Sequence, residues 1–329
     1  MRKARIALVG LGGWGGEQGI NAVKKNTDVL DLITWFDASP EVVEQRRSEM
    51  PVPPASSWQE VLENPNIEGV ILVVPNHVHT PLVLDVARHG KHVFIEKPLA
   101  NTLAECDEIV KACDDAGVIL QTGHCLRRVP AVRKAKQLLD EGRIGELVML
   151  EGHQSHRGGW TVKEGQWRWY NESCPGGPLN LLGIHQIDNM HYLAGPSVEV
   201  NAMFAKKCLP AEIPEITQVI IRFESGILGY IGDTYVSPAK TETCVYGTEG
   251  FMEIDCLKSH LKFYDIDGKL TEMPCEKIEL IPDEYREFAE CIITGKQPET
   301  GGAEGRAAVA LMEAAIRSAR TGQVEKIDR

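Results

Sequence analysis

Short apolar runs alternate with amphipathic helical stretches over the first 122 residues. The runs are rich in Val, Ile and Leu, as is typical of buried strands, and the stretches between them have a helical pattern. Because strands that alternate with helices form βαβ units, this region predicts a parallel sheet with both faces covered. The expected strands are 4–9, 30–36, 69–74, 92–95 and 118–122, and the expected helices are 15–25, 40–50, 80–89 and 103–116.

The pattern changes after residue 123. A basic helix (130–141), a strand (146–154) and a helix (181–193) come first, and strand-like segments then follow one another with turn residues such as Ser225-Gly226 between them. Successive strands with tight turns predict a large open, mainly antiparallel sheet. The later strands are expected at 199–206, 217–224, 227–235, 241–246, 250–255, 260–264 and 269–273, and the closing helices at 283–293 and 303–321.

A glycine-rich turn follows the first expected strand. The sequence Gly10-Leu11-Gly12-Gly13-Trp14-Gly15 has the spacing G-x-G-x-x-G. In a Rossmann fold the first glycine makes the tight turn, the second lets the backbone approach a diphosphate, and the third lets the helix pack on the strand. The diphosphate then lies at the positive end of the helix dipole. Taken alone the pattern is weak, because any tight strand-to-helix turn could use these glycines.

Asp37 strengthens the dinucleotide interpretation. It ends the second expected strand about twenty residues after the glycines, where a carboxylate accepts hydrogen bonds from the adenosine ribose. A carboxylate there repels a 2′-phosphate, and Ala38 and Ser39 bring no basic side chain to neutralise one. The pattern therefore favours NAD over NADP. The alternative is that Asp37 caps the helix that begins near Pro40.

Composition and charge exclude several classes of protein. A chain of 329 residues predicts about two domains. We place an N-terminal Rossmann domain at 1–122 and a C-terminal α+β domain at 123–329.

The formal net charge of −12 argues against a nucleic-acid partner and against an anionic membrane surface. We also expect no signal peptide, no membrane span and, since the nine cysteines form no C-x-x-C pair, a reduced cytoplasmic protein.

Polar residues follow the third, fourth and fifth expected strands. In such sheets the ligand lies beyond the carboxyl ends of the strands, so these residues are the first candidates for a site. Each has a simpler explanation, because Asn76 could cap a helix and Lys97 could be a solvated loop residue. The candidate segments are Pro75–Pro81 with Asn76 and His79, Glu96-Lys97-Pro98, and Gly123-His124.

Three motifs together resemble one family. The glycine turn, Glu96-Lys97-Pro98 and the segment from Gly177 to Asp188 with His185 are similar to the glucose–fructose oxidoreductase / inositol dehydrogenase / MocA family, and Arg127-x-x-Pro130 extends the match. The resemblance implies NAD(P)-dependent dehydrogenases or reductases of sugars, cyclitols and sugar nucleotides. The expected cofactor-binding residues are Gly10, Gly12, Gly13, Trp14, Gly15, Asp37, Pro75, Asn76, His79, Glu96, Lys97 and Arg127.

Lys97 and His185 are the expected catalytic residues. Hydride transfer from a carbinol carbon needs a fixed nicotinamide ring and a base that takes the hydroxyl proton. By the resemblance, Lys97 is the active-site lysine, and its charge would stabilise a developing alkoxide. His185 is the better candidate for the base because its ordinary pKa lies near working pH. Lys97 as the base, with His185 as a substrate anchor, stays open.

One position departs from the family pattern. Much of the family has Asp or Asn four residues before the histidine, and this chain has Leu181 there. Asn180, Asp188 or a histidine of the second domain could take over. Aromatic residues interleaved with arginines suit a sugar, although they could equally form a seam between domains or a subunit contact. The substrate candidates are His153, His156, Arg157, Trp167, Arg168, Asn180 and Asp188.

The sequence therefore predicts an NAD-dependent oxidoreductase acting on a secondary hydroxyl or ketone of a sugar, glycoside or cyclitol. The alternatives are an NAD-dependent glycoside-cleaving enzyme that uses transient oxidation and elimination, and a non-catalytic nucleotide-binding sensor. We expect no metal, because the histidine pairs lack a completing cysteine or carboxylate. The partners expected are a small sugar or polyol and further copies of the chain, as a homodimer or homotetramer through the C-terminal sheet.

Overall fold

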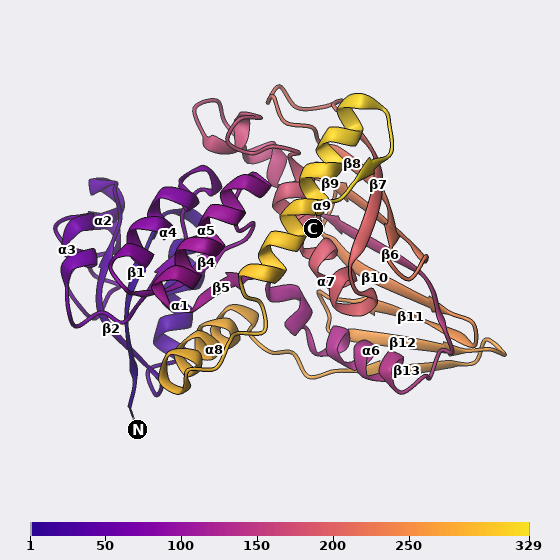
Figure 1. Cartoon of the computed structure of the whole chain (residues 1–329), viewed down its shortest axis with the longest axis horizontal. Coiled ribbons are helices and arrows are strands. Elements are labelled where there is room, and N and C mark those ends of the chain that lie inside the picture. Colours follow the sequence, from indigo (N-terminus) through magenta and orange to yellow (C-terminus); the bar gives the residue numbers. More distant parts are fainter. Residues whose placement is uncertain (1, 329) are drawn as a thin grey trace. The chain divides into compact units, whose positions relative to one another are not determined.

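The computed structural model describes residues 2–328, apart from the side chain of Trp14 (Figure 1). The chain divides into two compact units. The first contains the residues up to Gly123 together with Glu279–Arg306, and the second contains His124–Ile278 together with the residues from Ala307 onward. The sequence placed Glu279–Arg306 in the second domain, and the structure joins this segment to the first unit.

The first unit holds a parallel sheet, as the sequence predicted. Its strand order is β2-β1-β3-β4-β5. The order reverses between β1 and β3, and in doubly wound sheets ligands bind in the crevice outside the carboxyl ends of the strands at such a point. The strands are β1 (Ala4–Val9), β2 (Leu30–Phe36), β3 (Gly69–Leu72), β4 (His92–Glu96) and β5 (Leu120–Gly123).

Helices pack around this sheet. Helix α8 (Leu280–Thr294) lies against α1 and β1, and the ring of Phe94 in β4 meets Tyr285 and Phe288 of α8 edge-to-face at 5.0 and 6.0 Å. This aromatic packing explains why a segment from late in the chain belongs to the first unit. Helix α4 packs on α5. The other helices of this unit are α1 (Gly13–Lys25), α2 (Pro40–Arg46), α3 (Trp58–Glu63), α4 (His79–Arg88) and α5 (Leu103–Ala116).

Helix α3 is absent from the sequence prediction. It begins after Ser57, whose hydroxyl accepts a hydrogen bond from the Glu60 N–H at 3.2 Å. A Ser followed three residues later by Glu marks the start of a helix, so the sequence did contain the necessary pattern.

The second unit is built on an open sheet in the order β13-β12-β11-β10-β6-β9-β8-β7-β14. Neighbouring strands are antiparallel except for the parallel pair β6 and β9, which confirms the predicted mainly antiparallel sheet. The strands are β6 (Leu147–Ser155), β7 (Ser197–Ala205), β8 (Ile216–Phe223), β9 (Leu228–Thr234), β10 (Lys240–Gly247), β11 (Gly250–Asp255), β12 (His260–Asp265), β13 (Leu270–Pro274) and β14 (Glu325–Lys326).

The two faces of this sheet differ. Along β8, buried residues such as Val219 alternate with exposed ones such as Ile220, as expected for a strand with one covered face. Helices α6 (Pro130–Asp140) and α7 (Ile184–Ala194) pack on the covered face, which we call the inner face. The outer face carries Ile220 and Met203 with exposed fractions of 52% and 77%. Helix α9 (Gly302–Thr321) is fastened to β7 by the Ser318 hydroxyl, which accepts the Ala202 N–H at 3.0 Å.

None of the helices within residues 2–328 is both long and apolar enough to cross a lipid bilayer.

Candidate functional site: a glycine turn in one unit and a histidine helix in the other

The glycine turn joins β1 to α1 at the switch point of the parallel sheet. Gly10 has φ of +87°, and a Cβ built there would lie 2.3 Å from the Val73 carbonyl oxygen. A Cβ on Gly15 would lie 2.4 Å from Cγ1 of Val73. The close packing against Val73 therefore requires glycine at both positions. Gly12 precedes the helix and supplies no side-chain cap, so the first-turn N–H groups of α1 form a backbone cradle that suits a diphosphate.

Asp37 lies beside this turn at the end of β2. Its Oδ2 accepts the Leu11 N–H at 2.8 Å, and its Oδ1 accepts the Ser39 N–H at 2.8 Å. The side-chain cap of α2 comes from Ser39, whose hydroxyl accepts the Val42 N–H. Asp37 therefore braces the glycine turn, and the alternative that it caps the following helix is wrong.

Arg46 is a residue of this region that the sequence prediction missed. Its Nε donates to the Leu11 carbonyl at 3.3 Å, and its Nη1 contacts Glu49 at 3.0 Å. Val42, one turn earlier on α2, lies 3.9 Å from where a Cβ on Gly12 would be. The i, i+4 spacing of Val42 and Arg46 was visible in the sequence, but the fact that this face of α2 meets the glycine turn was not.

His79 lies in the core of the first unit. It is fully buried, its Nδ1 lies 3.0 Å from the Pro98 carbonyl, and its Nε2 lies 3.1 Å from the Val74 carbonyl. Burial lowers the pKa of its imidazole. The ring thus connects the segment after β3 to the Glu96-Lys97-Pro98 loop, and this geometry does not support a direct contact with a cofactor. Pro75 and the buried Asn76 lie just before it, and Asn76 begins a 3₁₀ turn, η1 (Asn76–Val78).

Glu96 ends β4, and the partly exposed Lys97 follows it on the loop, joined to Pro98 by a cis peptide bond. Burial raises the pKa of the Glu96 carboxyl to about 7, although the Lys97 ammonium and the Lys97 N–H lower it. The Oε1 atom of Glu96 has no hydrogen-bond partner among the described residues. At neutral pH Glu96 is therefore a mixture of acid and carboxylate next to a cation.

His185 belongs to the second unit, in the first turn of α7. Its exposed fraction is 7%, and its ring meets that of His124 edge-to-face at 6.3 Å. Asp188, one turn further along the same face, binds the Arg127 guanidinium through two hydrogen bonds, at 2.8 Å from Nε and 2.5 Å from Nη2. Both members of this ion pair are buried, and Arg127 also lies over the Tyr192 ring. The expected cofactor role of Arg127 and the expected substrate role of Asp188 stay predictions.

The segment before His185 is a π-helical turn, η5 (Leu179–Gly183), where the sequence predicted an ordinary helix. The Ile184 N–H bonds to the Leu179 carbonyl, five residues back. Asn180 is fully buried in this turn, whereas Leu181 packs on a hydrophobic cluster with Cys174 and Leu209. Leu181 is therefore a partly buried residue that packs against the core, which explains an apolar side chain at this position.

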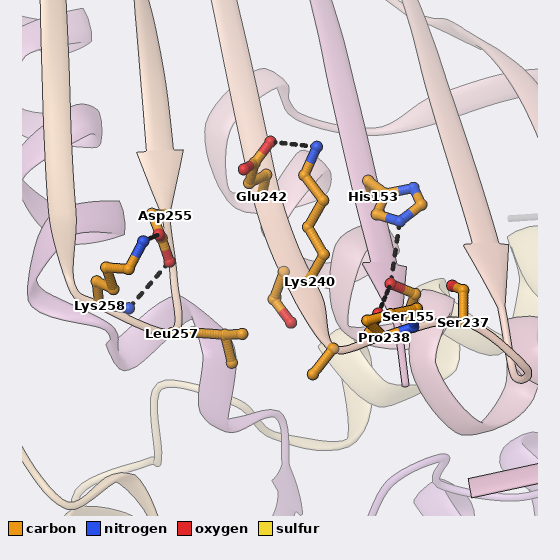
Figure 2. A pocket seen from close by; sticks show the side chains of 11 residues that line it. His153, Ser155, Ser237, Pro238, Lys240, Glu242, Asp255, Leu257 and Lys258 are labelled. Atoms are coloured by element: carbon orange, nitrogen blue, oxygen red, sulfur yellow. Dashed lines mark hydrogen bonds and ion pairs between the residues drawn. The ribbon is translucent and has the colours of Figure 1, made fainter. Parts of the chain in front are cut away.

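His153 lies on the outer face of the sheet. Its neighbour Gly152 faces α7, since a Cβ there would lie 2.9 Å from the Gln186 Oε1, and successive side chains of a strand point to opposite faces. The structure therefore does not bring His153 together with His185. His153 and Ser155 line a hollow of about 520 Å³. Figure 2 shows their side chains next to each other, joined by a hydrogen bond. The ion pairs of Lys240 with Glu242 and of Lys258 with Asp255 line the same hollow.

The remaining substrate candidates lie on the segment that follows β6. His156 caps a 3₁₀ turn, η3 (Arg157–Thr161), through Nδ1, and its ring meets Tyr235 at 5.0 Å. Trp167, in η4 (Trp167–Trp169), packs on the cluster that contains Tyr235 and carries the exposed Arg168 over its ring at 4.6 Å. Arg157 is exposed. The aromatic residues therefore contribute to the core of this unit, and their contact with a sugar stays a prediction.

Within residues 2–328, no three His, Cys, Asp or Glu side chains lie close enough together to hold a metal ion.

Two family models match the chain. The oxidoreductase-family model with an NAD-binding Rossmann fold matches residues 4–124, and the GFO/IDH/MocA C-terminal domain matches residues 132–253. The chain belongs to the Gfo/Idh/MocA family of oxidoreductases. The resemblance drawn from the three motifs is thereby confirmed, and this Gfo/Idh/MocA protein is an NAD(P)-binding oxidoreductase.

Similar proteins act on sugars and cyclitols. The scyllo-inositol 2-dehydrogenase (NAD(+)) of Bacillus subtilis strain 168 is 28% identical, over 99% of this chain and 97% of that protein. The D-xylose 1-dehydrogenase [NADP(+)] of Haloarcula marismortui is 24% identical, over 98% and 93% respectively. The solved structure of aldose-aldose oxidoreductase from Caulobacter crescentus, complexed with glycerol, has a TM-score of 0.88 at 26% identity and covers 99% of this chain and 100% of that one.

Proposed function

We propose that this protein is an NAD-dependent oxidoreductase that transfers hydride between nicotinamide and a secondary hydroxyl or ketone of a sugar, glycoside or cyclitol. The observation that carries the proposal is the bracing of the glycine turn by Asp37, which holds a carboxylate where a dinucleotide presents its ribose hydroxyls. The names of the Bacillus and Haloarcula relatives, a cyclitol and a sugar dehydrogenase, support the substrate class.

Asp37 also supports NAD over NADP. The two relatives are named for different nucleotides, so their names do not decide the matter. A carboxylate at the ribose position repels a 2′-phosphate, and the nearby Arg46 guanidinium already pairs with Glu49. The local charge therefore disfavours the 2′-phosphate of NADP and supports NAD as the cofactor.

The residues of the chain divide the chemistry between them. The amides around Gly12 and Gly13 would hold the diphosphate, and Asp37 the ribose; the bound nicotinamide would supply the hydride acceptor. The Lys97 ammonium stabilises negative charge that develops on the substrate oxygen. His185 accepts the hydroxyl proton, because an imidazole exchanges protons near neutral pH. Its burial at 7% exposure restricts the access of water to that proton.

The test is turnover of a panel of polyols, sugars and glycosides with NAD, followed as NADH absorbance. We expect Lys97→Met and His185→Asn to lower kcat by about 10² or more while NADH still binds, since general acid–base groups contribute about 10²–10⁴. His153→Asn is the control, because that imidazole lies on the outer sheet face, and we expect it to retain wild-type turnover.

Three outcomes would contradict the proposal. Release of an aglycone without net NADH would indicate glycoside cleavage through transient oxidation. Tight nucleotide binding with no turnover on any substrate, in wild type and in both variants, would indicate a sensor. Equal turnover of wild type and His185→Asn would remove His185 from the mechanism.

We also propose that a second copy of the chain covers the outer sheet face, giving a homodimer or homotetramer. Paired positions of six adjacent strands form a continuous apolar row there. The ring of Phe251 stacks on Tyr246 at 5.7 Å and on Tyr264 at 4.3 Å, and Leu228 and Leu270 at the ends are each 42% exposed. Such a row is self-complementary about a two-fold axis. Analytical sedimentation of the wild type should give the mass of a dimer or tetramer, and Phe251→Lys should give the mass of a monomer. A monomeric wild type would contradict the proposal.

A further inference from the structure

The two peptide groups that flank the α-carbon of Leu11 are held by side chains from outside the turn. The N–H of Leu11 donates to Asp37 Oδ2 at 2.8 Å. The carbonyl of Leu11 accepts from Arg46 Nε at 3.3 Å. Leu11 itself is fully buried, whereas Gly12 and Gly13, the next residues, are exposed. The glycine turn is therefore fixed on its protein side and open on the other.

The bond from Arg46 determines where the Gly12 N–H points. Leu11 C=O and Gly12 N–H belong to one planar trans peptide group, in which the carbonyl and the N–H point in opposite directions. As long as the carbonyl points at Arg46, the Gly12 N–H points away from the guanidinium. Gly12 is the second glycine of the G-x-G-x-x-G turn, the position where the backbone approaches a diphosphate.

Arg46 is itself held in place. Its Nη1 contacts both carboxylate oxygens of Glu49, at 3.0 and 3.2 Å, and its side chain is only 11% exposed. Gly16 leaves room for it, since a Cβ there would lie 2.7 Å from Arg46 Nη2 and 1.9 Å from the Leu11 carbonyl oxygen. The planar guanidinium can donate to a carbonyl and a carboxylate at fixed angles, which the single ammonium of a lysine does not reproduce.

We infer that Arg46 is a positioning residue for the dinucleotide: by holding the Leu11 carbonyl, it aims the Gly12 N–H at the diphosphate without touching the nucleotide. This inference rests on the nucleotide-binding part of the proposed function. Without Arg46 the Leu11 carbonyl loses its side-chain donor, the orientation of the Leu11–Gly12 peptide is less restricted, and binding must then order a donor that the native protein has already ordered.

The neighbouring Arg47 provides a matched control. It is the exposed C-cap residue of the same helix and pairs with Glu44, three residues away, at 3.3 Å, much as Arg46 pairs with Glu49. Arg46→Ala and Arg47→Ala therefore remove the same charge at adjacent positions, from the last residue and from the C-cap of α2. Only the first removes a donor to the glycine turn.

The experiment is titration of wild type, Arg46→Ala, Arg46→Lys and Arg47→Ala with NADH, ADP-ribose and adenosine, using calorimetry. We expect Arg46→Ala to lower the affinity for NADH and for ADP-ribose by the same factor of about ten, because the charge-assisted hydrogen bond from Arg46 to the Leu11 carbonyl is lost. Adenosine, which has no diphosphate, should bind Arg46→Ala and Arg47→Ala equally. Arg46→Lys keeps the positive charge but lacks the planar guanidinium with its several N–H donors, and it should bind ADP-ribose more weakly than wild type.

The melting temperature without nucleotide separates positioning from folding. Arg46→Ala should lose affinity for ADP-ribose even where its folded fraction equals that of Arg47→Ala. The inference is overturned, while the proposed function stands, if Arg46→Ala and Arg47→Ala both bind ADP-ribose with the affinity of wild type. It is also overturned if Arg46→Ala lowers the affinity for adenosine by the same factor as the affinity for ADP-ribose. If wild type binds neither NADH nor NADPH, the proposed function fails and the inference with it.

Discussion

Replacing Glu96 by Gln tests the electrostatics of the loop that carries Lys97. Glu96 is 8% exposed, and burial raises the pKa of its carboxyl from the ordinary value of 4.5 to about 7. The native state therefore keeps a proton on Glu96 over a pH range in which the unfolded chain has released it. The contribution of this bound proton to the free energy of unfolding is fully present below pH 4.5 and is lost as the pH rises through about 7.

The magnitude follows from the two pKa values. One pKa unit corresponds to about 1.4 kcal/mol, so raising the pKa from 4.5 to about 7 makes the native state about 3 kcal/mol less stable at pH 8 than below pH 4.5. Gln has nearly the same shape and does not ionise. Wild type should therefore lose about 3 kcal/mol relative to Glu96→Gln between pH 4.5 and pH 8.

Urea unfolding at several pH values measures this difference, and hydrogen exchange of peptides from β4 and β5 assigns it to the unit that holds Glu96. Glu108→Gln is the control for the removal of a carboxyl group, because Glu108 is exposed on α5. If the difference between wild type and Glu96→Gln were the same at pH 4.5 and pH 8, the Glu96 carboxyl would have the same pKa in the native and unfolded states, and the reasoning would be refuted.

Three further changes test other parts of the structure. Asp188→Asn removes the carboxylate that pairs with the buried Arg127 guanidinium and should cost about 3–5 kcal/mol in denaturant melts. Asp107→Asn, whose ion pair is exposed, should cost at most about 1 kcal/mol, and equal costs would contradict this. Burial lowers the pKa of His191 to about 4, so wild type should lose about 3 kcal/mol as the pH falls from 6.5 through 4, and His191→Gln should resist acid better. Asp37→Ser should shift the ratio of NADPH to NADH affinity toward NADPH by about ten-fold, since it removes the charge that repels the 2′-phosphate, and an unchanged ratio would remove Asp37 as the discriminating group.

Much of the fold follows from local patterns along the chain. The apolar runs and the helical stretches between them predicted the parallel sheet, and strands separated by tight turns predicted the mainly antiparallel one. The glycine turn was equally local, because Gly10 has a φ of +87°, a backbone conformation that glycine adopts without strain. In each case the residues that carry the information are neighbours in the sequence, or repeat with the period of a strand or a helix.

The candidate site depended on contacts between distant segments. The sequence placed His153 near the chemistry, but the two-residue alternation of β6, together with the side on which α7 packs, puts it on the outer face. It placed α8 in the second domain, whereas the rings of Tyr285 and Phe288 pack on Phe94 in the first unit.

The sequence by itself determined the fold class, the family and the nucleotide-binding turn. Only the tertiary structure decided that Arg46 reaches that turn, that His79 is a core residue, and that Leu181 packs against a hydrophobic cluster beside the buried Asn180. The physical reason is that backbone conformation and amphipathic period depend on a few consecutive residues, whereas the partner of a side chain depends on which elements pack together. That packing is set by the burial of apolar surface over the whole unit.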